Sequence, residues 1–379
     1  MGHRVLIVES TLREGEQFAG AHFSSADKQA IACILDRFGV PYIEVTSPAA
    51  SPRAFDDARM LVSLGLRARL LAHVRCVPAD VERALEAGVH GVNLYFGTSP
   101  LMREHGHRRD VEAIISAARD CINLVRAAGR EVRFGCEDAF RTPEADILRV
   151  CTALDEAGVD RFSLADTVGV ATPRRVDELV RLVRRNVRAE IEFHGHDDSG
   201  CAVANAHAAV EAGARFVDTS VLGIGERNGI SALGAVMARL YTSDPSLIEG
   251  YALPLIPEID SLVAGIIGVE VPFNAAISGR NAFAHAAGAH TAAVLRDPRT
   301  YEAIDPAAFG LSRTLHLGHH LTGRHALAGR AETLGLSLDA EALTRATWAI
   351  KEAAGQRPLA DAELDHILRS YHNSAGACR

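Results

Sequence analysis

Three side chains of the types that bind divalent metal ions stand at the ends of two apolar, strand-like segments. His194 and His196 alternate at the end of segment 190–193, so both imidazoles project from one face of an extended chain. Glu14 follows the opening segment 5–8 within a dense polar stretch. Two imidazoles and one carboxylate form a facial ligand set that leaves metal positions open for a substrate. We expect Glu14, His194 and His196 to bind a metal ion, although a His-x-His pair is also compatible with two polar residues at a strand end.

Cationic side chains stand at comparable positions on other segments. Arg13 directly precedes the acidic candidate, Arg133 lies on segment 131–134, and His73 ends a further apolar segment. An arginine can hold a carboxylate through two parallel hydrogen bonds, so these three side chains together would bind a dianionic substrate. Each of them alone is equally compatible with a solvated or ion-paired residue at a rim.

The overall charge limits how an anionic ligand can be held. The chain has 40 basic and 48 acidic residues, a formal net charge of −8. This balance argues against nonspecific binding of nucleic acid and against adhesion to an anionic membrane. An anionic ligand must therefore be bound by a few well-placed cations.

A recurring sequence pattern predicts the helices and strands that position these side chains. Helical segments end at Gly39, Gly88, Gly158 and Gly213, and each leads into a short apolar run. The expected strands are 5–8, 42–45, 68–73, 92–95, 131–134, 161–164, 190–193 and 216–218. Their alternation with helices indicates a parallel sheet, and eight units in about 220 residues predict a (β/α)₈ TIM barrel. An open doubly wound sheet is the alternative, but no GxGxxG turn follows the first strand. Ligands of such barrels bind at the C-terminal strand ends, where the candidate residues stand.

The alternation stops near residue 230, and the remaining chain is mainly helical in pattern. We expect a catalytic barrel over 1–235, a linker and lid over 236–310, and a C-terminal helical subdomain over 311–379. No signal peptide or membrane-spanning run is evident, and the seven cysteines are dispersed without a CxxC pair. These features predict a cytoplasmic protein with reduced thiols and no membrane association.

Eight short motifs form an ordered series over nearly the whole chain. They are STLREGEQ at 10–17, IEVTSP at 43–48, LADTVG at 164–169, HGH at 194–196, GIGERNG at 223–229, FAH at 283–285, GAH at 288–290 and LTGRH at 321–325. In this order they resemble the homocitrate synthase family, a branch of the metal-dependent acyl transferases that includes isopropylmalate synthase. The resemblance implies addition of acetyl-CoA to the ketone of 2-oxoglutarate, followed by thioester hydrolysis, which gives homocitrate and CoA.

The resemblance also implies roles for residues near the ketone. Glu14, His194 and His196 match the ligands of a divalent metal, whether Mg²⁺, Mn²⁺, Co²⁺ or Zn²⁺. Arg13 matches an arginine that stabilises charge developing on the ketone oxygen. Thr167 matches the residue that holds the neighbouring carboxylate.

Further matches concern the far end of the acceptor and the acetyl donor. His73 and Arg133 match residues that reach the distal acid group. Glu192 and His290 resemble the acid/base machinery that removes a proton from the acetyl methyl group. In the family His290 would come from a neighbouring subunit, which implies a homodimer whose C-terminal region reaches the neighbouring active site.

Departures from the family pattern leave the acceptor open. Glu9 and Asn93 replace usual aspartates, Gly135 a usual serine, Asp197 a usual asparagine and Ala286 a usual lysine. Gly135 should enlarge the distal pocket, and Asn93 should weaken inhibition by lysine. We expect a homocitrate synthase, with synthesis of 2-phosphonomethylmalate from phosphonopyruvate as the alternative. A non-catalytic regulator that binds an oxo acid is a third hypothesis, against which the intact metal set argues.

Overall fold

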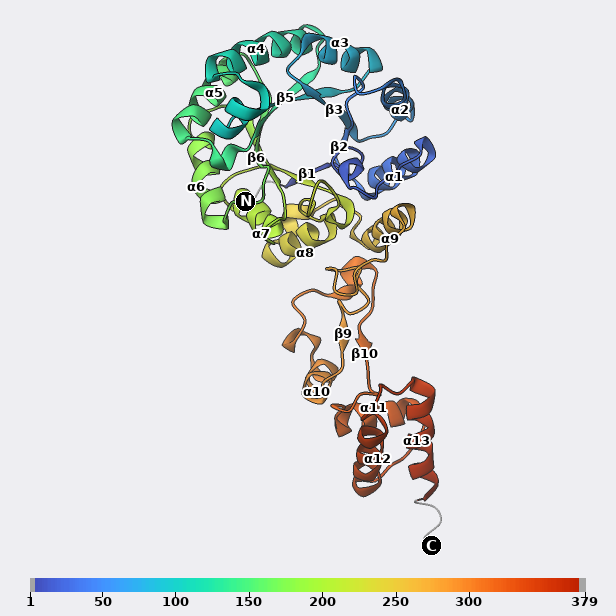
Figure 1. The fold of residues 1–379 in the computed structure, drawn as a ribbon. Coiled ribbons are helices and arrows are strands. Elements are labelled where there is room, and N and C mark those ends of the chain that lie inside the picture. Colours follow the sequence, from blue (N-terminus) through green and yellow to red (C-terminus); the bar gives the residue numbers. More distant parts are fainter. Residues whose placement is uncertain (1–3, 375–379) are drawn as a thin grey trace. The chain divides into compact units, whose positions relative to one another are not determined.

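Eight parallel strands close into a barrel in the computed structural model, which describes residues 4–374. The strands are β1 (Leu6–Glu9), β2 (Tyr42–Val45), β3 (Arg69–Arg75), β4 (Gly91–Gly97), β5 (Glu131–Glu137), β6 (Arg161–Asp166), β7 (Glu190–Gly195) and β8 (Phe216–Thr219). Each strand pairs with its neighbour in chain order, and β8 closes the ring by pairing with β1, with Phe216 beside Leu6 (Figure 1). The predicted TIM barrel is confirmed, and the open doubly wound alternative is wrong.

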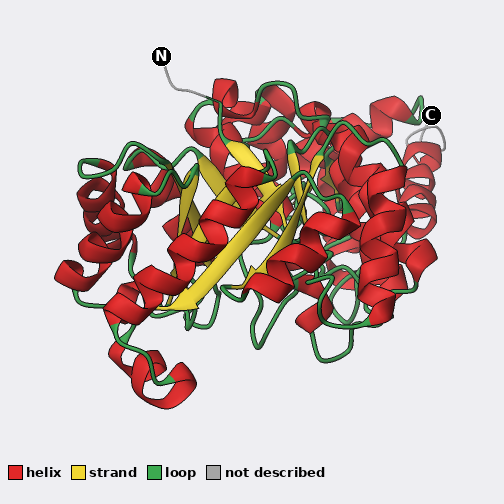
Figure 2. Cartoon of the chain, turned by 90° about the horizontal axis from the view of Figure 1, so that it is seen from above, coloured by secondary structure: helices red, strands yellow, loops and turns green. Residues whose placement is uncertain are grey.

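Helices alternate with the strands and surround them (Figure 2). They are α1 (Ser25–Phe38), α2 (Pro52–Ser63), α3 (Pro78–Ala87), α4 (Val111–Ala127), α5 (Glu144–Glu156), α6 (Pro173–Arg184), α7 (Ala202–Glu211) and α8 (Leu233–Ser243). Local sequence sets their ends. A reciprocal capping box between Ser24 and Asp27 starts α1, and Gly39 ends it in the left-handed conformation, with φ of 96°. Gly88 ends α3 in the same way, with φ of 86°, as the recurring sequence pattern predicts.

Strand β5 shows how residue alternation divides the barrel into two layers. Val132, Phe134 and Cys136 are completely buried, and α4 packs on this strand from outside. Arg133 and Gly135 point to the inside, where they line a cavity. Because side chains on a strand alternate between its faces, one segment supplies both the apolar packing layer and the polar interior.

The chain divides into two compact units, with the boundary between Ser278 and Gly279. The first unit holds the barrel and α9 (Ile256–Ile267), which packs on α1. The boundaries predicted from the sequence are 235 and 310, and the three parts that they define remain a prediction.

Within the described residues, the second unit contains a short parallel strand pair and four α-helices. These are β9 (Ala284–His285), β10 (Thr314–Leu315), α10 (Gly288–Arg296), α11 (Arg324–Thr333), α12 (Ala340–Ala353) and α13 (Asp361–Ser374). Leu327, Ile350, Leu364 and Leu368 form the buried core of the last three helices. The predicted helical C-terminal region is confirmed. None of the helices within residues 4–374 combines the length and the apolarity that crossing a membrane requires.

Candidate active site

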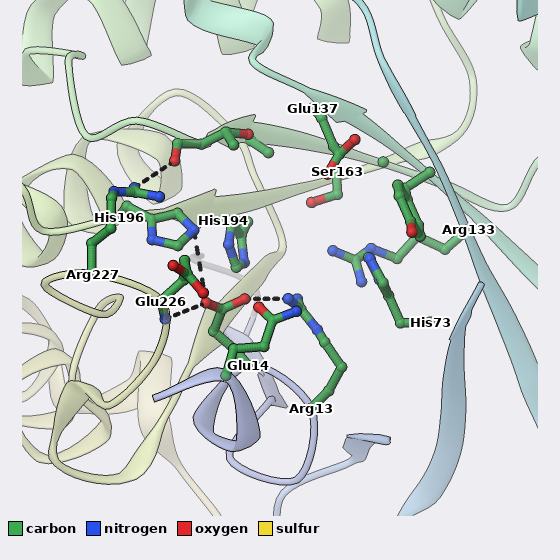
Figure 3. A pocket seen from close by; sticks show the side chains of 15 residues that line it. Arg13, Glu14, His73, Arg133, Glu137, Ser163, His194, His196, Glu226 and Arg227 are labelled. Carbon is green, nitrogen blue, oxygen red and sulfur yellow. Dashed lines mark hydrogen bonds and ion pairs between the residues drawn. The ribbon is translucent and has the colours of Figure 1, made fainter. Parts of the chain in front are cut away.

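A cavity of about 260 Å³ opens at the C-terminal ends of the barrel strands. Most of the site residues predicted from the sequence line it: Arg13, Glu14, His73, Arg133, Thr167, His194 and His196. Figure 3 shows the two histidines and Glu14 on one side of this cavity, and Arg133 with His73 on the other. The fold therefore brings together side chains from β1, β3, β5, β6 and β7 that are far apart in the sequence.

The predicted metal ligands form a compact group. Ligand atoms of Glu14, His194 and His196 all lie within 4.8 Å of one another, and all three residues are buried. One oxygen of Glu14 accepts the backbone N–H of Glu226 at 2.9 Å. The Nδ1 atom of His194 lies 2.9 Å from a carboxylate oxygen of Asp218, which fixes the orientation of the imidazole and leaves Nε2 for another partner.

The protonation states of this group suit a metal ion. Burial is the main cause that lowers the pKa of both His194 and His196 to about 4, so both imidazoles are neutral at pH 7. Burial alone would raise the pKa of Glu14, but the positive charge of Arg13 and the two imidazoles outweigh it and lower that pKa to about 2. Metal binding requires neutral histidines and an ionised carboxylate. The Nδ1 atom of His196 is buried without a hydrogen-bond partner among the described residues. The donor set therefore fits a divalent ion.

The predicted substrate-binding side chains include two fixed arginines and a neutral histidine. Arg13 contacts Glu14 and donates from Nε to Glu44 at 2.5 Å. His73 stacks on Tyr95 with 4.2 Å between ring centroids. Burial and then the charge of Arg13 lower the pKa of His73 to about 4, so it acts as a hydrogen-bonding group and not as a cation at pH 7.

Arg133 belongs to a buried group of charges that we call the core network. Its members are Glu44, Arg133, Arg161, Glu192 and Asp218, all at most 3% exposed. Arg133 donates to Glu44 at 2.8 Å and to Asp218 at 3.0 Å, and it contacts Glu192. Because Glu192 precedes the candidate ligand His194 on β7, the network lies one layer deeper in the barrel than the candidate metal ligands, and Arg133 is the member that also lines the cavity.

Glu192, the predicted acid/base residue, is a member of the core network and does not line the cavity. Its carboxylate contacts Arg133 and lies 3.2 Å from Nε of Arg161. Burial raises its pKa to about 8, against the lowering effect of Arg133. The catalytic role of Glu192 remains a prediction, and the structure provides a second carboxylate in a more accessible position.

That second carboxylate is Glu137, to which sequence reasoning assigned no role. It ends β5, lines the cavity beside Ser163 (Figure 3) and makes no side-chain ion pair with any of residues 4–374. Burial raises its pKa to about 7, although Arg13 lowers it. The alternation of Arg133, Gly135 and Glu137 on one face of β5 is the sequence signal for this residue.

Two more residues show how loops complete the cavity. Thr167 accepts the backbone N–H of Asp138 at 2.8 Å, which fixes its hydroxyl at the cavity wall. Arg227, from the motif at 223–229, donates to the backbone oxygen of Thr167 at 2.7 Å and to Asp198 at 2.8 Å. Sequence reasoning assigned no role to Arg227.

His290, the other predicted acid/base residue, belongs to the second unit. It is exposed on α10 and stacks on Tyr301, with 4.1 Å between ring centroids. His285, five residues earlier in the chain, lies 3.0 Å from Glu302. Glu302 also pairs with Arg313 at 2.9 Å. His285 is thus held within its unit, and the role of His290 remains a prediction.

Comparison with known proteins places the chain in a family. Residues 4–263 match the HMGL-like family, and residues 277–358 match the homocitrate synthase post-HMGL domain-like family. Mitochondrial homocitrate synthase of Penicillium rubens is 48% identical over 372 residues, which cover 98% of this chain and 78% of that protein. The chain belongs to the homocitrate synthase family. This confirms the resemblance seen in the motifs.

A second relative agrees with this membership, and a solved structure agrees with the fold. The mitochondrial homocitrate synthase of Schizosaccharomyces pombe is 48% identical over 367 residues, covering 97% of this chain and 88% of that protein. Among solved structures, an HMG-CoA lyase of Bacillus subtilis superposes with a TM-score of 0.64 at 23% identity, covering 72% of this chain and 97% of that one. The latter similarity supports the barrel fold alone.

Two of the positions at which the sequence is expected to depart from the family pattern lie at this site. Asn93 is completely buried, contacts Glu44 and lies 2.9 Å from Nδ1 of His73. Gly135 lines the cavity, and a Cβ atom there would meet its nearest neighbours, in Leu94 and Tyr95, at 3.6 Å. Packing therefore leaves room for a small side chain at 135, and the glycine widens the cavity.

Proposed function

We propose that this member of the homocitrate synthase family is an acyltransferase that condenses acetyl-CoA with 2-oxoglutarate and hydrolyses the thioester, giving homocitrate and CoA. The observation that carries the proposal is the grouping of Glu14, His194 and His196 beside Arg13 in one cavity. Such a site provides both a metal position and a fixed cation where an oxo acid must bind.

Glu14, His194 and His196 would hold a divalent metal, of which Mg²⁺, Mn²⁺, Co²⁺ and Zn²⁺ are compatible with the donor set. When bound, the ion would supply Lewis-acid polarisation of the ketone of the 2-oxo acid. Arg13 lies against Glu14, so its guanidinium can stabilise negative charge on the ketone oxygen. Asp218 keeps His194 in the tautomer whose Nε2 carries the lone pair.

The two ends of the acceptor would be held on different strands. The fixed hydroxyl of Thr167 would bind the carboxylate next to the ketone. Arg133 and His73 would bind the distal acid group from the far side of the cavity. Because Arg133 is already paired with buried carboxylates, it is held rigidly, and little conformational entropy is lost when the substrate binds.

Glu137 is the residue that we propose to take the proton from the acetyl methyl group. It lines the cavity, whereas Glu192 is enclosed by arginines below it. A general base works best when its pKa lies near the working pH, and that of Glu137 is raised to about 7. Proton removal by Glu137 would leave an enolate-like donor carbon, which then forms the new bond to the ketone carbon.

Other features of the proposal extend beyond this cavity. His290 would act with Glu137 from a neighbouring subunit, in a homodimer whose C-terminal region reaches the neighbouring active site. Both relatives named above are described as mitochondrial, and the cytoplasmic location expected for this chain remains a prediction.

Two alternatives remain to be tested against this proposal. The wider cavity at Gly135 would accommodate the tetrahedral group of phosphonopyruvate, but the names of the curated relatives favour 2-oxoglutarate. A non-catalytic oxo-acid-binding regulator would not need an unpaired carboxylate such as Glu137 beside a metal set.

Release of free thiol tests the proposal directly. Purified protein, acetyl-CoA and 2-oxoglutarate should release CoA only when Mg²⁺ or Mn²⁺ is present, and mass spectrometry should identify homocitrate. A chelator should stop the reaction, and added metal should restore it. Absence of CoA release with every 2-oxo acid tried would overturn the proposal.

A further inference from the structure

A second cavity, of about 270 Å³, is lined by residues of α7, α8 and α9 and of the loops that follow β7, β8 and α9, and we call it the back cavity. Most of its lining is apolar and includes Val203, Leu222, Ile230 and Pro272. No lysine, arginine or histidine is among the described residues that line it, whereas the acidic residue Asp260 is. All of these residues belong to the first unit, and none of the roles proposed above uses this cavity.

The carboxyl group of Asp260 is buried, and one of its oxygens is unsatisfied. Asp260 lies on α9 and is only 3% exposed. Its Oδ2 atom accepts the hydroxyl of Ser278 at 2.5 Å, whereas Oδ1 has no hydrogen-bond partner within residues 4–374. Burial raises the pKa of Asp260 to about 6, so the carboxyl group is still mostly ionised at pH 7. A buried carboxylate is unfavourable until a cation with N–H donors pairs with it.

The wall beside Asp260 offers further oxygen atoms to a cation. Gly234 has no side chain, and a Cβ atom there would lie 3.4 Å from the carbonyl oxygen of Ala276 and 3.6 Å from Oδ2 of Asp260. The two oxygens therefore lie close to one point of the cavity wall. An ammonium group suits such a point because it has three donors and no acceptor. Asp197, one of the positions expected to depart from the family pattern, adds a second carboxylate to the lining.

The loop after β8 contributes to both the back cavity and the candidate active site. Leu222 and Ile230 line the back cavity, whereas Glu226 and Arg227 line the active-site cavity (Figure 3). The backbone N–H of Glu226 donates to the carboxylate of Glu14 at 2.9 Å. Leu222 and Arg227 are left-handed, with φ of 57° and 55°, and such strained residues concentrate at functional sites. A ligand in the back cavity would therefore contact the same loop that positions a candidate metal ligand.

We infer that the back cavity binds a small aliphatic ammonium ion and that this binding strengthens the metal site. The ammonium group pairs with Asp260, and the carbon chain lies along Leu222 and Ile230. Contact with the loop restricts its motion and keeps the backbone N–H of Glu226 on Glu14. The two binding events are then coupled, so each ligand raises the affinity for the other by the same factor. The ammonium site stands without the proposed function, whereas the coupling rests on the proposed metal ligands.

Calorimetric titration of the concentrated protein with n-butylammonium chloride, at fixed ionic strength, tests the ammonium site. The wild-type protein should bind it saturably with a Kd of about 1 mM, an affinity within reach of a ligand of this size. n-Butanol has the same carbon chain but no charge, so it should show no saturable binding. Asp260→Asn keeps the size of the side chain and an oxygen for Ser278. It should raise the Kd by about tenfold or more, because a charge-assisted hydrogen bond is lost.

Two more variants make the binding test specific. Ala235→Leu leaves Asp260 in place but fills the back cavity, so it should abolish n-butylammonium binding. Asp80→Asn removes the same charge from a buried residue of α3, outside the back cavity, and should leave the Kd unchanged. All variants should have the circular dichroism of the wild-type protein. Absence of saturable binding to the wild-type protein would overturn the inference, and so would a Kd of Asp260→Asn within twofold of wild type.

Metal affinity tests the coupling without turnover. Saturating n-butylammonium should lower the Kd of the wild-type protein for Mn²⁺ about fivefold, at the lower end of usual allosteric couplings, and should leave that of Asp260→Asn unchanged. Saturating Mn²⁺ should lower the Kd for n-butylammonium by the same factor. An unchanged Mn²⁺ constant in wild-type protein that binds both ligands would refute the coupling alone. Wild-type protein that binds no Mn²⁺ would refute the coupling and the proposed function together, whereas the first titration decides the ammonium site in either case.

Discussion

The core network and the wall of the candidate active site each contain a glutamate, and the two glutamates have opposite surroundings. In the core network, Glu192 is completely buried and held by Arg133 and Arg161. At the wall of the candidate active site, Glu137 lines the cavity of about 260 Å³ and a neighbouring one, and it has no ion-pair partner within residues 4–374. Burial raises the pKa of both carboxyl groups, to about 8 for Glu192 and about 7 for Glu137. A shifted pKa therefore does not by itself identify a catalytic group in this barrel, because access to the substrate also has to be present.

The difference assigns separate tasks to the two layers. The core network fixes Arg133 and, through Asp218, the candidate metal ligand His194. The layer above it presents the candidate metal ligands, the unpaired carboxylate of Glu137 and an open cavity. Paired and dry charges maintain geometry, whereas unpaired charges next to a cavity are available for chemistry.

Removal of a metal ligand should have the largest effect. His194→Ala should abolish metal retention and lower kcat by about 10⁴-fold or more, since Lewis-acid polarisation is worth several kcal/mol. Metal content is measured by atomic emission after desalting, and kcat by thiol release. Retained metal and activity would remove His194 from the ligand set.

Substitution of glutamine for Glu137 and for Glu192 tests whether the two glutamates differ in function as they differ in surroundings. Glu137→Gln should lower kcat by about 10²–10³-fold with little change in KM, because a general base is lost. Glu192→Gln should keep kcat within about tenfold but lower thermal stability, since an unpaired buried N–H costs about 1–3 kcal/mol. Steady-state kinetics and thermal unfolding of both variants check this. The reverse pattern, with Glu192 essential and Glu137 dispensable, would restore Glu192 as the base.

Loss of the contact between Asp218 and His194, which joins the core network to the candidate metal ligands, should lower metal affinity by an intermediate amount. Asp218→Asn keeps the size of the side chain but removes the carboxylate that orients His194. Metal affinity should fall by about 10–100-fold, the usual effect of losing such a partner. Competition with a metal-binding dye gives the dissociation constant. An unchanged constant would show that the core network does not support the metal set.

The pH dependence should be the smallest and most specific effect. Glu137 must be deprotonated to act as a base, so kcat/KM should rise tenfold per pH unit below its pKa and level off above it. Burial raises the pKa of Glu137 to about 7, and the positive charge of a bound metal would lower it. The rising limb of the plot of kcat/KM against pH should therefore lie at or below pH 7. The residual activity of Glu137→Gln should lack this limb. A limb that persists in that variant would assign it to another group.

The strands and helices of the barrel could be predicted from the sequence because short stretches of residues determine where each of them begins and ends. Glycines such as Gly39 and Gly88 end helices in the left-handed conformation, and the runs that follow are the barrel strands. The grouping of Glu14, His194 and His196 could be predicted for a similar reason, since alternation puts the two histidines on one face.

The different surroundings of Glu137 and Glu192 could not be predicted from the sequence in this way. Glu137 and Glu192 both lie on inward faces of strands, and their difference depends on Arg161, which contacts Glu192 from the neighbouring strand β6. Such a pairing is set by the register between β6 and β7 and by side-chain packing inside the barrel, which sequence spacing does not give. The π-helical turn at Met102–His107 likewise follows from tertiary contacts of His107 and has no periodic signal.

The acceptor preference of the wild-type protein tests the central claim most directly. With metal and saturating acetyl-CoA, kcat/KM is measured for 2-oxoglutarate, oxaloacetate and phosphonopyruvate in parallel, and each product is identified by mass spectrometry. The account predicts the highest kcat/KM for 2-oxoglutarate, with homocitrate as the product. A higher kcat/KM for phosphonopyruvate, with 2-phosphonomethylmalate as the product, would contradict it.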